Sequence, residues 1–380
     1  TPSRAALMTG RYPMRYGLQT LVIFPSHTYG LPMDERTLPQ ALKDAGYKTL
    51  MVGKWHLGHA DRKYWPQNRG FDYFYGNVVG EVEYFTRERG GLIDWQRNGT
   101  FLKEHGYYTD LIGDDAVKLI DQQDGKAPFF LYFASLAPHA PYQAPQSVID
   151  QYKNVPDKLR RTYMAMITVL DTQVGRVVAE LDRKGLRDNT IILFASDNGG
   201  ATSGLFAQGA KSNEERRTEE GGIGQGEKAP ASNAPFSGGK GSLREGGVSV
   251  PAFVNWPAKL KPRVVSEPLH MVDVMPTLLA LARIREREID IAQAHGAVKR
   301  EVPDKKATSV LGLVRQRSLL IFAGAMMLFQ LANAAMLPLM AGVVTTRSSQ
   351  WAPVLIAACI IVPQAIVALC SPSVGRKAQA

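Results

Sequence analysis

Gly46-Tyr47-Lys48-Thr49-Leu50-Met51-Val52-Gly53-Lys54-Trp55-His56-Leu57-Gly58 joins a short apolar run to two basic side chains. The residues from Tyr47 to Val52 predict a strand. Beyond it, Lys54 and His56 stand two residues apart, so an extended backbone would point both to one side while Trp55 faces the core. Taken alone, a Lys-x-His pair is more often exposed surface charge than a binding site.

Working outward from this strand, short apolar runs alternate with amphipathic stretches through residues 1–282. This alternation is typical of an α/β fold with a mostly parallel sheet covered by helices. We expect helices over 38–45, 109–122 and 157–184, and strands over 47–52, 129–136 and 190–195. In the longest helix, apolar residues recur every three or four positions and predict a core face: Tyr163, Met166, Ile167, Leu170, Val174, Val177, Val178 and Leu181.

The first residues, Thr1-Pro2-Ser3-Arg4-Ala5-Ala6-Leu7-Met8-Thr9-Gly10-Arg11, predict a short helix. Thr1 suits the N-cap and Pro2 the first turn. Unpaired amides at such a helix start, with the charge of Arg4 beside them, are suited to an anion such as sulfate. An ordinary capped helix is the alternative, since capped helices are common.

Three further segments place polar groups after strands or among glycines. Asp197-Asn198 follows the strand at 190–195 and offers oxygen ligands for a hard cation such as calcium, although Asp-Asn-Gly-Gly is also good turn chemistry. His139, between two prolines, follows the strand at 129–136, and a satisfied structural histidine is its alternative. Lys240 lies in a glycine-rich run from Gly238 to Pro251 that lacks the P-loop spacing. Residues 201–239 read as a long surface loop.

Together these segments resemble the motifs of type I sulfatases, members of the alkaline-phosphatase superfamily. The resemblance covers residues 1–282 and includes a His-x-x-Asp-x-x-Pro-Thr run from His270 to Thr277. It implies a mixed sheet flanked by helices and an arylsulfatase-type sulfuric ester hydrolase acting on a sulfated small molecule or sugar. By this resemblance, Lys54 binds the sulfate oxygens and His56 assists the nucleophile. Lys240 would supply positive charge to the sulfate or to the leaving oxygen, and His139 would donate to a sulfate oxygen or protonate the leaving alcohol. Arg4 adds positive charge, and Asp197 and Asn198 bind a divalent cation, calcium being the one implied.

In that family the residue directly before the position of Thr1 is a Cys or Ser, which is oxidised to formylglycine. Its hydrated aldehyde attacks the sulfur of the ester. An upstream segment supplies a pair of Asp ligands to the metal. Because the printed sequence begins at Thr1, we expect formylglycine at the position before it and no sulfatase activity from these 380 residues alone. Binding of a sulfated ligand without catalysis is the alternative.

Charge and cysteine content set the C-terminal part of the chain apart. Residues 283–380 carry +7 of the net charge of +10, and they hold both cysteines, Cys359 and Cys370. The basic excess therefore belongs mainly to the tail, and no interleaved basic and aromatic pattern accompanies it. We expect no nucleic-acid partner.

Two uncharged stretches, Ser318–Thr346 and Ser348–Gly375, are long enough to cross a bilayer. They predict a hydrophobic helical hairpin of two transmembrane helices and membrane association through residues 318–370; buried core helices are the alternative. This tail also resembles part of a major facilitator superfamily transporter. We therefore predict a sulfatase domain over 1–282, a charged linker over 283–316 and a membrane segment over 317–380. The sulfatase part alone would be periplasmic, secreted or lysosomal. A membrane protein with a sulfatase-like appendage and a chimera of two unrelated fragments remain competing interpretations.

Overall fold

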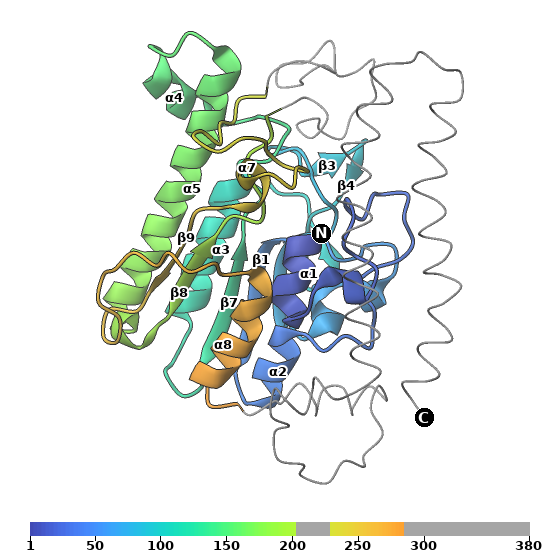
Figure 1. Cartoon of the computed structure of the whole chain (residues 1–380), viewed down its shortest axis with the longest axis vertical. Coiled ribbons are helices and arrows are strands. Elements are labelled where there is room, and N and C mark those ends of the chain that lie inside the picture. The colour runs from blue at the N-terminus through green and yellow to red at the C-terminus, as the bar shows by residue number, and fades with distance from the viewer. Residues whose placement is uncertain (203–228, 285–380) are drawn as a thin grey trace, which may run out of the picture. The chain divides into compact units, whose positions relative to one another are not determined.

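The main sheet runs in the order β6-β5-β2-β1-β7 (Figure 1). The structure is a computed structural model that describes residues 1–202 and 229–284, all of which belong to one compact unit, Thr1–Val298. The strands are β1 (Lys48–Lys54), β2 (Tyr73–Asn77), β3 (Glu88–Arg89), β4 (Leu92–Ile93), β5 (Gln96–Arg97), β6 (Thr100–Phe101), β7 (Phe129–Ala134), β8 (Ile192–Ala195) and β9 (Ala252–Asn255).

Helices connect and cover these strands. The α-helices are α1 (Pro2–Thr9), α2 (Leu38–Asp44), α3 (Tyr108–Asp121), α4 (Gln146–Ile149), α5 (Lys158–Arg183), α7 (Glu245–Val248) and α8 (Val274–Leu281). Short 3-10 helices are η1 (Pro13–Arg15), η2 (Arg62–Tyr64), η3 (Pro66–Arg69), η4 (Asp150–Tyr152), η5 (Arg187–Asn189) and η7 (Met271–Asp273).

Strand β1 lies between two parallel neighbours. Val52 is paired with Tyr75 of β2 on one side and with Phe133 of β7 on the other. Strands β5 and β6 add to the β2 edge in antiparallel orientation. The predicted mixed sheet is therefore confirmed, and its parallel part puts the carboxyl ends of β1, β2 and β7 at one edge.

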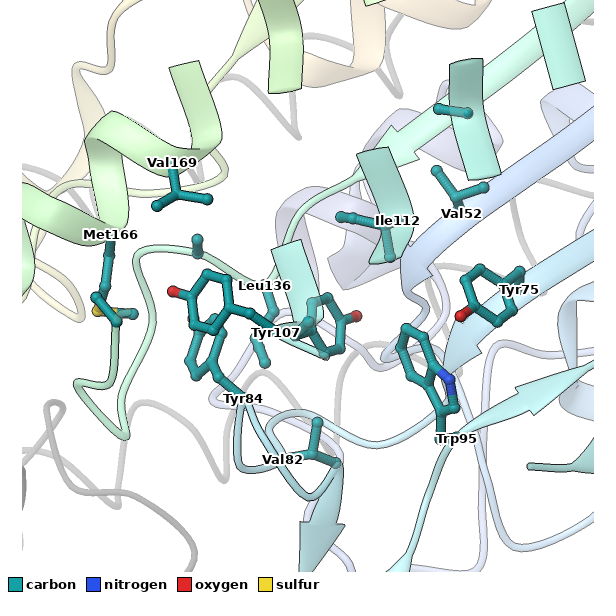
Figure 2. Close-up of a cluster of buried hydrophobic side chains, with 14 of the residues drawn as sticks. Val52, Tyr75, Val82, Tyr84, Trp95, Tyr107, Ile112, Leu136, Met166 and Val169 are labelled. Carbon is teal, nitrogen blue, oxygen red and sulfur yellow. The ribbon is translucent and has the colours of Figure 1, made fainter. Parts of the chain in front are cut away.

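Alternation along β1 decides which helices cover which face of the sheet. Leu50 and Val52 point into one hydrophobic cluster with residues of α3 and α5, including Ile112, Met166 and Val169 (Figure 2). On the opposite face, Met51 packs in a cluster with residues of α1, and α2 packs against α8. Figure 1 shows the resulting arrangement, with α3 and α5 on one side of the sheet and α1, α2 and α8 on the other.

The predicted elements agree with the structure to within about two residues at most ends, which is the usual scatter of helix boundaries. Two expectations are wrong in detail. The strand at 190–195 was expected in a mostly parallel sheet, but within the described residues β8 pairs with β9 alone, in antiparallel orientation. On α5, Ile167 is 43% exposed although its periodicity predicted a core position. The buried side of α5 is narrower than the apolar stripe, because only one side of the helix packs on α3.

The tail predictions cannot be compared with this structure. The membrane hairpin, the transporter-like tail and nearly all of the charged linker fall in residues 285–380, and most of the predicted surface loop falls in 203–228, all outside the described ranges. Within the described ranges, 1–202 and 229–284, no helix combines the length and apolar character needed to cross a membrane.

Candidate active site

The ends of three strands meet at the N-terminus of α1. Lys54 is the last residue of β1, His139 follows β7, and Asp197 lies two residues beyond the end of β8. Thr1 donates its hydroxyl to the carbonyl of His56 at 3.2 Å, which brings the start of α1 to the same place. Thr1 is the N-cap residue as expected, but its side chain makes no capping bond. The hydroxyl instead accepts from the amide of Ile23 at 3.0 Å.

Arg4 connects these strand ends. Its guanidinium donates to the carbonyl of Lys54 at 2.7 Å and to the hydroxyl of Tyr132 at 3.2 Å. It also reaches the carbonyl of Ser135 at 3.4 Å and the carboxylate of Asp197 at 3.3 Å. The Arg4 side chain is only 9% exposed. With four protein acceptors around it, the guanidinium clamps β1, β7 and the segment after β8 together, and its charge adds to the positive field of the site.

Lys54 is buried, with 4% of the residue exposed. Burial lowers the pKa of its ammonium to about 7, the positive charge of Arg4 acts in the same direction, and the carboxylate of Asp197 opposes both. A lysine in this condition is close to half protonated near neutral pH. An incoming anion would favour the charged form, because a negative charge nearby raises a lysine pKa.

The backbone conformation at His56 differs from the extended one that the sequence predicts. Trp55 is fully buried as expected, but His56 has a φ of 62°, so the chain does not stay extended through this residue. The amide of His56 donates to the carbonyl of Val78 at 3.1 Å. Burial, followed by the positive charges of Lys54 and Arg4, holds the pKa of the His56 ring well below its usual value. The ring is therefore neutral at pH 7.

His139 and Lys240 form a direct pair, although 101 positions separate them in sequence. The Nζ of Lys240 lies 3.1 Å from Nε2 of His139. Burial lowers the pKa of both groups, and the charges of Lys54 and Lys240 lower that of His139 further. The glycine-rich run holds Lys240 in place, since the amide of Lys240 donates to the carbonyl of Gly200 at 3.1 Å. Two distant motifs thus supply one basic pair.

Close backbone approach explains the glycines on both sides of this pair. A Cβ on Gly199 would lie 1.8 Å from the carbonyl oxygen of Gly246, and a Cβ on Gly246 would lie 2.4 Å from the carbonyl oxygen of Gly238, so neither residue has room for a side chain. Asn233 ties the same two segments together: its amide oxygen accepts from the amide of Gly200 at 2.8 Å, and its amide nitrogen donates to the carbonyls of Gly200 and Gly238.

Asp197 and Asn198 supply only part of a cation site. Burial opposes ionisation of Asp197, but Arg4 and Lys54 outweigh it and hold the pKa of the carboxyl well below its ordinary value. Asn198 donates its side-chain amide to the carbonyl of Gly199 at 2.9 Å, as in a local turn. Calcium takes six to eight oxygen ligands. No group of three or more His, Cys, Asp or Glu side chains suited to a metal ion occurs in residues 1–202 and 229–284, so the described residues do not by themselves fit calcium.

All seven predicted site residues occur in this part of the molecule, where Arg4 contacts Asp197 and His139 contacts Lys240. Sequence reasoning missed Glu81, whose side chain is 9% exposed and lies 3.5 Å from Nδ1 of His139. It also missed Tyr132 and Asn233. Tyr132 lies inside an apolar strand and Asn233 inside a polar loop, so neither carries a local pattern that differs from an ordinary strand or turn residue.

Comparisons with known proteins agree with this geometry. A family model described as Sulfatase matches residues 1–284. Arylsulfatase J of Mus musculus is 36% identical over 299 residues, which cover 76% of this chain and 45% of that protein. N-acetylgalactosamine-6-sulfatase of Homo sapiens is 32% identical over 313 residues, covering 76% and 55%. The chain thus spans about half the length of the curated relatives it matches.

Solved structures also share the fold of this chain. The structure of Ps i-CgsB in complex with k-i-k-neocarrahexaose is 35% identical, with a TM-score of 0.66 over 76% of this chain and 62% of that one. The structure of BT4656 in complex with its substrate D-glucosamine-2-N,6-O-disulfate is 19% identical, covers 76% of this chain and 68% of that one, and has a TM-score of 0.55. At that identity the second likeness shows a shared fold alone.

Proposed function

The chain belongs to the sulfatase family, and we propose that its site binds and hydrolyses a sulfate ester of a sugar. One observation carries the proposal: Arg4, Lys54, His56, His139 and Lys240 gather at the strand ends with depressed pKa values at both lysines and both histidines. Crowded cations are relieved by an anion, and a sulfate group bears the negative charge and the acceptor oxygens that such donors bind.

Each residue then has a role that follows from its contacts. Lys54 and Lys240 present ammonium groups to the sulfate oxygens and offset the charge that grows on the transferring group. His139, whose Nε2 faces Lys240, protonates the leaving alcohol once it has gained a proton. His56, buried and neutral, accepts a proton from the attacking hydroxyl near the start of α1. Arg4 keeps these groups together by holding the carbonyl of Lys54 and the carboxylate of Asp197.

A formylglycine directly before Thr1 would supply the attacking hydroxyl, as the family resemblance implies. The amides at the start of α1 and the charge of Arg4 would stabilise negative charge at that position. Asp197 and Asn198 would give two oxygen ligands to a divalent cation, with the rest coming from outside the described residues. We also propose that the substrate is reached outside the cytoplasm, in a periplasmic, secreted or lysosomal setting.

A sugar substrate is favoured over other sulfate esters by the relatives. One is named N-acetylgalactosamine-6-sulfatase, and another was solved with a carbohydrate, neocarrahexaose. Both are at least 32% identical to this chain. The proposal extends their carbohydrate chemistry to this site.

An assay of sulfate release tests the proposed hydrolase activity. The gene product that contains this chain, with formylglycine verified by mass spectrometry, should release sulfate from a sulfated galactosamine, a carrageenan oligosaccharide or 4-methylumbelliferyl sulfate. His139→Ala should reduce turnover by about 10²–10⁴-fold, the usual contribution of a general acid, while leaving the thermal melt unchanged. No release from any of the three substrates by the verified enzyme would refute the proposal.

A further inference from the structure

The loop that follows β2 contacts both histidines of the site. A Cβ on Gly80 would lie 2.6 Å from Nε2 of His56, so glycine at this position lets the ring pack on the backbone. The next residue, Glu81, places Oε2 at 3.5 Å from Nδ1 of His139. Two adjacent residues therefore border the two imidazoles from the same side of the site.

The hydrogen bonds of His139 assign the proton on its neutral ring. Nδ1 lies 2.7 Å from the carbonyl oxygen of Ala140, which can only accept, so Nδ1 carries the hydrogen. Nε2 then bears the lone pair and accepts from the ammonium of Lys240 at 3.1 Å. Tyr84 fixes the backbone of the same residue by donating its hydroxyl to the carbonyl of His139 at 2.9 Å. The ring is held with Nε2 toward Lys240 and Nδ1 toward Glu81.

Glu81 is itself held in place. Its second oxygen, Oε1, lies 3.0 Å from the guanidinium of Arg89 on β3, and the Glu81 side chain is 9% exposed. A carboxylate this well covered remains ionised only with such a partner. Arg89, Glu81, His139 and Lys240 therefore contact one another in that order. The Glu81 carboxylate faces the Nδ1 side of the imidazole.

We propose that Glu81 is a positioning residue: the carbonyl of Ala140 holds the Nδ1–H of His139, and the Glu81 carboxylate beside it stabilises the imidazolium formed when Nε2 is protonated. At 3.5 Å the contact is electrostatic rather than a well-formed hydrogen bond, since such bonds are shorter. Its catalytic consequence rests on the proposed function. When His139 acts, the Nε2–H bond breaks, an O–H bond forms on the leaving alcohol, and the ring returns to the neutral tautomer described above.

Several other charged groups act on the same ring. Lys240 from the glycine-rich run and Lys54 at the end of β1 oppose protonation of His139, while Asp197 after β8 favours it. His56 is a further neighbour in the same electrostatic field. Burial and the two lysines hold the pKa of His139 well below its ordinary value. The hydrogen bond to Ala140 acts with Asp197 in the opposite direction, and the Glu81 carboxylate at 3.5 Å adds to them when sulfate neutralises the lysines.

Nitrogen-15 NMR of the histidine rings tests the proposal without any turnover. Spectra of the full chain are recorded against pH, with and without saturating sodium sulfate, and the His139→Asn variant identifies the His139 signals among the seven histidines. With sulfate, Glu81→Gln should lower the ring pKa of His139 by about one unit or more, the effect expected for an adjacent opposite charge. Glu81→Asp should lower it less, because the charge is kept at a longer distance.

Glu88→Gln is the matched control, since Glu88 precedes Arg89 on β3, whereas the carboxylate that faces Nδ1 of His139 is that of Glu81. An unchanged His139 titration in Glu81→Gln, or an equal change in Glu88→Gln, would overturn the proposal. If sulfate does not bind, the proposed function fails, and the Nδ1–H assignment of the neutral ring is still read from the sulfate-free spectra. A ring protonated at Nε2 there would also overturn the proposal.

In the active enzyme, Glu81→Gln should lower kcat on the order of 10-fold with little change in KM. This loss is a part of the rate enhancement that a general acid supplies. The basic limb of the kcat profile should move to lower pH by the same interval as the NMR titration, because the protonated ring is the active form. A loss confined to KM, or a kcat loss with an unmoved profile, would indicate a structural role and contradict the proposal.

Discussion

Replacing Arg4 should separate its role as a clamp from any role in holding the substrate. The guanidinium lies between two carbonyl oxygens, a tyrosine hydroxyl and a carboxylate, which belong to Lys54, Ser135, Tyr132 and Asp197. Arg4→Ala would leave the carbonyl of Lys54 without this donor and Asp197 without its closest cation. We therefore expect the folded state itself to weaken.

The size of the loss follows from the geometry. Only the bond to Lys54, at 2.7 Å, is short, and the other three span 3.2–3.4 Å. Removing one member of a buried charged pair costs about 3–5 kcal/mol, most of it from the partner left behind. Asp197 is 40% exposed and regains some hydration, so we expect about 3 kcal/mol, at the lower end. Arg4→Lys should recover little, because a single ammonium cannot reach acceptors arranged around a planar fork.

Equilibrium urea unfolding followed by tryptophan fluorescence measures this loss. Arg176→Ala is the control: its ion pair with Asp114 at 2.6 Å is 44% and 60% exposed and should contribute less than about 1 kcal/mol. Adding Asp197→Ala to Arg4→Ala should show a coupling energy of about 0.5–3 kcal/mol. A destabilisation by Arg4→Ala no larger than that of the control would refute the clamp.

Three further outcomes follow from the site. Sulfate affinity, measured by calorimetry, should fall about tenfold per pH unit above the Lys54 pKa of about 7. Lys54→Met should remove this pH dependence. Because the pKa of Lys54 is lower in the folded than in the unfolded state, the free energy of unfolding should rise with pH between about 7 and 10.5. Gly80→Ala should weaken sulfate binding by displacing the His56 ring, whereas retained binding and an unchanged His56 NMR signal would count against this packing. Gly199→Ala should lower the melting temperature, because its Cβ meets the carbonyl of Gly246 at 1.8 Å and overpacking costs about 1–3 kcal/mol; an unchanged melt would contradict it.

Local sequence patterns predicted most of the helices and strands. The unbroken apolar run Leu50-Met51-Val52 predicts that β1 is buried on both faces, and the structure places these side chains in clusters on opposite sides of the sheet. The periodicity of 157–184 predicted α5 closely. It could not predict how wide the buried stripe would be, and Ile167 is exposed for that reason.

The sequence by itself determined which chemical groups this protein has: the cations, the histidines and the Asp-Asn pair after a strand are each visible as short motifs. Only the tertiary structure decided which of them meet. Arg4 contacts Asp197 across 193 positions, and Glu81 faces His139 because the loop after β2 and the residues after β7 come to the same edge of the sheet. Propensity and periodicity act over a few residues, whereas these contacts depend on strand order and on the packing of helices on both faces. No local pattern encodes them.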